Sequence, residues 1–152
     1  MSDQHAGAAG WPSDGEAAGQ KRLEVMTSKL PAAVVVGVRG EVDAFTSADF
    51  GAEVDAALNE DTPMVVIDLN EVRLFGSSGL AVLVAAETAA RDSGRLLRVV
   101  VDDRRPVIHP MMVTGLTGYL TLFHDLDDAL AAGPDAPGDP IGADPPVAPD
   151  RR

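Results

Sequence analysis

Short apolar runs alternate along this chain with segments of helical periodicity. Residues 32–38, 64–69 and 96–101 are continuous runs rich in Val, Leu and Ile, a pattern typical of strands covered on both faces. The intervening residues, 47–59 and 80–92, carry apolar side chains at three- and four-residue spacing. Strand–helix alternation with short connections predicts an α/β fold whose parallel strands are joined by right-handed crossovers.

Weaker patterns complete this core. Residues 23–27 alternate apolar and polar side chains and predict an edge strand, and residues 120–123 predict a short last strand. A helix is expected after Pro106, and another at 125–131 with Asp125 as its N-cap. We therefore expect a single α/β domain at residues 21–132, with a mixed sheet of four to five strands and about four helices.

Both ends of the chain differ from this core in composition. Residues 1–20 are rich in Gly, Ala, Ser and Asp, and residues 133–152 contain six prolines and three glycines. Such segments bury too little apolar surface to offset the entropy lost on ordering. We predict a flexible acidic tail at the N-terminus and a disordered, Pro/Gly-rich acidic tail at 133–152.

Charge and composition exclude several classes of function. The net charge of −12 repels phosphate backbones and anionic membranes, so neither nucleic acid nor a membrane is an expected partner. The chain has no cysteine, and its three histidines are far apart, which argues against a metal site. No signal peptide is evident, and we expect a cytoplasmic protein without cofactors.

Two loops between a predicted strand and a predicted helix carry polar residues that could act at a surface. The first is Gly76-Ser77-Ser78-Gly79. A serine here is compatible with an ordinary helix cap. It is also placed where the helix dipole favours an added phosphate, which would change the surface by charge and bulk.

The second loop, residues 39–46, contains Asp43 and is by itself compatible with a solvated acidic turn. Sites in α/β sheets gather at the carboxyl ends of the strands. If the strands that precede the two loops are neighbours, Asp43 and Ser77 share one end of the sheet.

Three segments in collinear order resemble the STAS domain, and most closely the free-standing bacterial anti-sigma factor antagonists. Residues 38–43 (VRGEVD) are similar to its glycine–acid–apolar–aspartate signature, and residues 65–80 are similar to its central motif. Residues 116–122 and 127–130 are similar to its C-terminal end. The resemblance covers about residues 22–132.

This resemblance implies a regulatory protein and not an enzyme. It implies that Ser77 is phosphorylated by an anti-sigma factor that is also a serine kinase, and that the unphosphorylated chain binds this kinase and releases a sigma factor. The partner-binding residues implied are Asp43, Gly76, Ser77, Ser78 and Gly79. ATP would belong to the partner, and neither a small-molecule substrate nor a metal is implied.

Gly76 departs from the family pattern, in which an aspartate precedes the phosphorylated serine. The departure favours an alternative, a non-phosphorylated STAS scaffold subunit of a larger signalling or lipid-transport assembly. A small serine hydrolase is a remote alternative. A nucleophile elbow needs glycine two residues before and after the serine, and neither Ser77 nor Ser78 has both.

Overall fold

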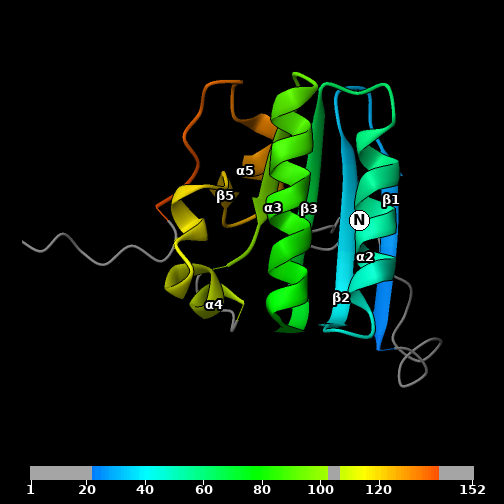
Figure 1. Cartoon of the computed structure of the whole chain (residues 1–152). Coiled ribbons are helices and arrows are strands. Elements are labelled where there is room, and N and C mark those ends of the chain that lie inside the picture. The colour runs from blue at the N-terminus through cyan, green and yellow to red at the C-terminus, as the bar shows by residue number, and fades with distance from the viewer. Residues whose placement is uncertain (1–21, 103–106, 141–152) are drawn as a thin grey trace, which may run out of the picture.

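Five strands form one sheet in the part of the chain that the computed structural model describes, residues 22–102 and 107–140 (Figure 1). The spatial order follows the sequence: β1 (Leu23–Lys29), β2 (Val34–Val42), β3 (Met64–Phe75), β4 (Leu96–Val100) and β5 (Leu122–Phe123). β1 is antiparallel to β2, and the other neighbouring pairs are parallel. The predicted mixed α/β sheet is confirmed.

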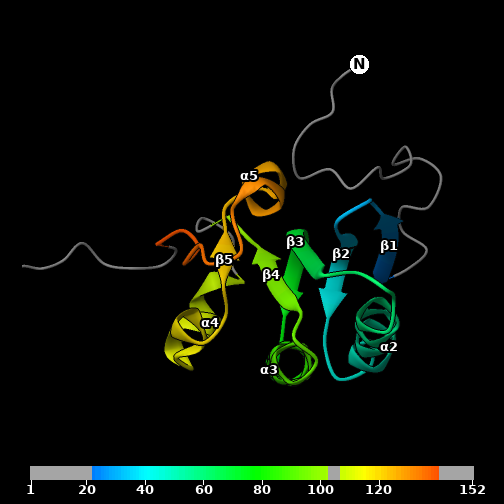
Figure 2. The same ribbon diagram turned by 90° about the horizontal axis from the view of Figure 1, so that it is seen from above.

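Helices cover both faces of this sheet (Figure 2). α2 (Ser47–Leu58), α3 (Ser77–Asp92) and α4 (Ile108–Val113) lie on one face, and α5 (Leu126–Ala131) lies on the other. A short 3₁₀ helix, η1 (Leu116–Gly118), follows α4. The larger apolar core lies between the sheet and α2 and α3, and a smaller one lies under α5. α5 begins at the predicted cap, where an Asp125 side-chain oxygen accepts from Asp128 N–H at 2.9 Å.

The central strands are longer than the apolar runs that predict them. β2 continues past Gly40 to Val42, and β3 continues past Leu69 to Phe75. Half of the residues in these extensions are polar, and Arg73 is exposed. α5 lies nearer the opposite end of the sheet (Figure 1). Register shifts near Gly40 let the pairing continue. The loops that follow therefore start further along the sheet than the sequence indicates.

Residues 133–140, assigned to the C-terminal tail by composition, contact the end of the sheet. Asp139 N–H donates to Leu122 O at 2.7 Å, and its carboxylate accepts from His124 N–H at 2.9 Å. The buried Arg98 guanidinium donates to the carbonyls of Ala129 and Ala132, both at 2.7 Å, and to that of Gly133. These contacts come from residues distant in the sequence, so composition does not reveal them.

Other predictions lie outside the described residues. The N-terminal tail at 1–20, the C-terminal residues 141–152 and the helix start at Pro106 belong to this group. The domain limits of 21–132 stay a prediction.

Gly79 lets the first turn of α3 lie close to the sheet. A Cβ at this position would come within 2.8 Å of both Phe75 Cζ and Val42 Cγ1. Phe75 itself packs edge-on against Phe50 of α2, with ring centroids 5.9 Å apart. Gly79 therefore sets the distance between the start of α3 and the ends of β2 and β3.

We expect Gly79→Ala to lower the free energy of unfolding by about 1–3 kcal/mol, because the added methyl group overpacks the core. The matched control is Gly51→Ala in the middle of α2, where a Cβ would lie 3.5 Å from Val82 in ordinary contact. That variant should gain about 0.4–1 kcal/mol in urea denaturation, because alanine restricts the unfolded chain more than glycine does. Equal effects of the two substitutions would contradict this account of Gly79.

Asp68 is a buried carboxyl group in the middle of β3. Only 2% of the residue is exposed, and its Oδ1 accepts from Asn70 N–H at 3.0 Å. Oδ2 has no hydrogen-bond partner in the described structure. Burial raises the pKa of Asp68 to about 6, an effect that the Asn70 bond opposes and the nearby Glu71 charge supports.

The folded state therefore favours the protonated form of Asp68. The stability that this protonation contributes is lost as the pH rises from about 4 through 6. A shift of about two pKa units corresponds to about 3 kcal/mol. Between pH 4 and pH 7, the unfolding free energy of the natural chain should fall by about this amount relative to that of Asp68→Asn, which does not ionise at this position. A difference that is constant with pH would contradict the elevated pKa.

Candidate functional site: two adjacent loops at the carboxyl end of the sheet

The β2–α2 loop (residues 43–46) and the β3–α3 junction (residues 76–78) are neighbours. We call them the paired loops. Val42 and Phe75, the last residues of β2 and β3, are register partners in the parallel pair. One residue further, Gly76 N–H donates to Val42 O at 2.8 Å. The hypothesis that Asp43 and Ser77 share one end of the sheet is confirmed at the level of geometry.

Ser77 is the first residue of the sixteen-residue helix α3, and its side chain is exposed. The N-cap position belongs to Gly76, so the interpretation of Ser77 as an ordinary helix cap is wrong. Its hydroxyl makes no hydrogen bond within the described part of the chain. Ser78 is partly buried. Of the two serines, Ser77 thus presents its hydroxyl more openly, at the positive end of a helix dipole.

Gly76 adopts φ −90° and ψ −177°, which is extended backbone open to any residue. A Cβ there would lie 3.6 Å from Val42 O, an ordinary contact. The fold therefore leaves room for a side chain at this position, and the glycine is not required by the turn.

Asp43 organises the β2–α2 loop through its carboxylate. Oδ1 accepts from the N–H groups of Phe45 at 2.9 Å and Thr46 at 3.1 Å. The Thr46 hydroxyl donates to Glu41 O at 2.9 Å and accepts from Asp43 N–H at 3.0 Å. Partial desolvation raises the pKa of Asp43, but the bonds from Phe45 and Thr46 and the charge of Arg22 outweigh it and hold this pKa below its ordinary value. Asp43 is therefore an anion at neutral pH.

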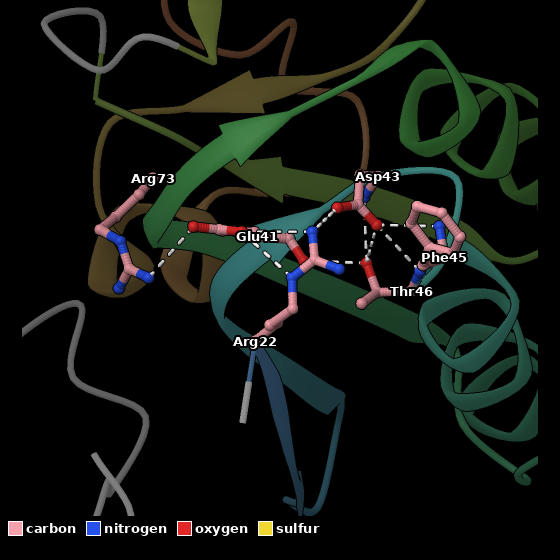
Figure 3. Close-up of polar contacts among 6 residues, drawn as sticks. All are labelled: Arg22, Glu41, Asp43, Phe45, Thr46 and Arg73. Atoms are coloured by element: carbon pink, nitrogen blue, oxygen red, sulfur yellow. Dashed lines mark hydrogen bonds and ion pairs between the residues drawn. The ribbon is translucent and has the colours of Figure 1, made fainter. Parts of the chain in front are cut away.

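Two arginines lie near the carboxylates of Glu41, close to the end of β2, and Asp43 (Figure 3). Arg22 forms an ion pair with Asp43 Oδ2, and its Nε lies 3.4 Å from Glu41 Oε1. Arg73 of β3 lies 3.6 Å from Glu41 Oε2. Neither arginine stands out in the sequence, because its proximity to these carboxylates depends on the register of β1 and β3 against β2.

Exposed apolar side chains lie close to these charges. Phe45, in the loop itself, is 84% exposed, and Leu74, the register partner of Glu41, is 50% exposed. α4 lies at the same end of the molecule and exposes Met112 and Val113 (Figure 1). Phe45 was visible in the sequence as a lone aromatic in a polar loop, but only the structure shows that it is not covered.

Neither a metal site nor a membrane-crossing helix is found in residues 22–102 and 107–140. No group of three His, Asp or Glu side chains is arranged to hold a metal ion there. No helix in these segments is both long and apolar enough to cross a bilayer.

Comparison with known proteins gives the same family by sequence and by fold. The family model described as "Mlab, STAS domain" matches residues 25–132. The chain is 31% identical over 97 residues to the anti-sigma-F factor antagonist RsfB of Mycobacterium tuberculosis, a match that covers 63% of this chain and 77% of RsfB.

Among solved structures, an anti-sigma factor antagonist from Mycobacterium paratuberculosis is similar at 28% identity, with a TM-score of 0.63 over 71% of this chain and 91% of that one. The phosphorylated form of SpoIIAA from Bacillus shares the fold alone, at 13% identity and a TM-score of 0.54 over 70% of this chain and 96% of that one. With its collinear motifs, its mixed sheet and these matches, the chain belongs to the STAS-domain family that includes the bacterial anti-sigma factor antagonists.

Proposed function

We propose that this protein is a cytoplasmic anti-sigma factor antagonist that binds an anti-sigma factor serine kinase and so releases a sigma factor. Phosphorylation of Ser77 by that kinase switches the binding off. The observation that carries the proposal is the exposed Ser77 hydroxyl at the start of α3, held beside the Asp43 loop by the bond from Gly76 to Val42. RsfB, a relative by sequence, is named as an antagonist of this class.

The paired loops have the features of a protein-binding surface. An exposed aromatic side chain at a fixed loop, flanked by charged groups, is typical of the residues that dominate binding energies. The net charge of −12 favours a partner with a basic surface through long-range attraction. Asp43, Gly76, Ser77, Ser78 and Gly79 form the proposed contact region, in which Gly79 acts through the position of α3.

Phosphorylation of Ser77 would change this surface without unfolding it. A phosphate carries about −1.5 to −2 charge, and the helix dipole tolerates an anion at the first turn of α3. The same charge would stand beside the anionic Asp43 loop and oppose burial against a partner. SpoIIAA, which shares the fold at low identity, has been solved with and without its phosphate, so this fold accommodates the modification.

The non-phosphorylated scaffold remains the second candidate because of one observation. Gly76 stands where the family has an aspartate, although a side chain would fit there. A kinase that reads this aspartate would not recognise the chain. The two candidates differ in whether Ser77 receives a phosphate.

Incubation with ATP and each purified anti-sigma factor kinase of the source organism tests the proposal. We expect one kinase to form a complex and to add a single phosphate at Ser77, read by mass spectrometry of the intact chain and its peptides. Ser77→Ala should abolish the modification but retain binding, while Ser78→Ala should leave the modification in place. Binding without phosphorylation would favour the scaffold, and absence of both would refute the antagonist proposal.

A substitution that mimics the charge separates the effect of charge from that of bulk. Ser77→Glu should weaken kinase binding at least about tenfold in calorimetric titration, because an added anion must be desolvated in the interface. Ser77→Gln, of the same size and without charge, should retain most of the affinity. An unchanged dissociation constant for Ser77→Glu would contradict the switch, and equal losses in both variants would assign the effect to bulk.

A further inference from the structure

Arg22 forms ion pairs with Glu41, near the end of β2, and with Asp43 of the β2–α2 loop (Figure 3). Its guanidinium pairs with Asp43 Oδ2, lies near Glu41 Oε1 and stands 5.8 Å from the centre of the Phe45 ring. The backbone of Arg22 is fixed beside the loop, since its carbonyl accepts from Glu41 N–H at 2.7 Å. Gly40 permits this approach, because a Cβ there would lie 2.2 Å from the same carbonyl.

The loop does not depend on Arg22 for its conformation. Asp43 Oδ1 holds the N–H groups of Phe45 and Thr46, and Thr46 Oγ1 closes the loop onto Glu41 O. Asp43 O also accepts from Ser47 N–H at 2.9 Å as α2 begins. These bonds leave Asp43 Oδ2 as the acceptor that faces outward, and Arg22 occupies it. The Arg22 side chain therefore binds to the loop but is not needed to hold its conformation.

Glu41, Asp43 and Phe45 together form a seat for a cationic side chain. Two carboxylates supply ion-pairing acceptors, and the exposed ring supplies a cation–π surface. The side chain of Arg22 is 52% exposed, so water screens the Arg22–Asp43 ion pair. Replacing Arg22 by another cation therefore costs little free energy. Because the whole chain carries −12, the seat would attract an external cation once it is vacated.

We propose that Arg22 is an intramolecular competitor for the docking loop. In the free chain its guanidinium fills the seat of Glu41, Asp43 and Phe45, and in the complex a cationic side chain of the partner replaces it. This inference rests on the proposed function for the identity of the partner.

Kinase binding by Arg22→Ala gives the first test. Loss of the competing pair should tighten binding about two- to fivefold in calorimetric titration, the range expected for an exposed ion pair. Lys29→Ala is the matched control, since it removes one positive charge from the far end of β1, where Lys29 pairs with Glu60 at 3.1 Å. That variant should bind like the natural chain. Unchanged binding by Arg22→Ala would overturn the proposal, and weaker binding would overturn it and make Arg22 part of the interface.

A second test needs no kinase. N-acetyl-arginine amide, titrated into the ¹⁵N-labelled chain, should shift the Phe45 and Thr46 amide signals more strongly in Arg22→Ala than in the natural chain or in Lys29→Ala. N-acetyl-citrulline amide, which is uncharged, should not shift the Phe45 or Thr46 signals in any of the three chains. Equal responses in all three chains would overturn the competitor role. A positive result without any kinase binding would support the seat and count against the proposed function alone.

Discussion

The parallel pairing of β2 with β3 is the constraint on which the candidate site depends. Pairing that continues to Val42 and Phe75, and the bond from Gly76 to Val42 O, bring two loops together that are 30 residues apart in the sequence. Neither loop is unusual alone. Because both strands end at the same edge, the helix start that presents Ser77 lies beside the loop that Asp43 organises.

Close packing beneath this edge holds the loops in place. Gly79 allows α3 to rest on Phe75 and Val42, and Phe75 contacts Phe50 of α2, so both helices start from one apolar cluster. A binding surface made of such supported loops needs little reorganisation, which lowers the entropy that binding must offset. Loops supported in this way would suit the proposed switch, in which a phosphate changes a preformed surface.

Local charge at this edge differs from the charge of the whole chain. The protein carries −12, yet Glu41 and Asp43 are matched at the loop by Arg22 and Arg73. A phosphate or a displaced arginine would each change this local balance by one or two charges. In the proposed complex, long-range attraction would bring a basic partner near, and the short-range balance of charge at the loop would then decide binding.

The sequence by itself determined the fold class, the order of the elements and the two loops, because apolar periodicity and turn residues are local signals. It also indicated Ser77 and Asp43 through the resemblance of their motifs. Only the tertiary structure decided that Gly76 and not Ser77 is the helix cap, that residues 133–140 contact β5, and that Arg22 reaches Asp43. These depend on strand register and on the paths of distant segments, which single-residue preferences do not specify.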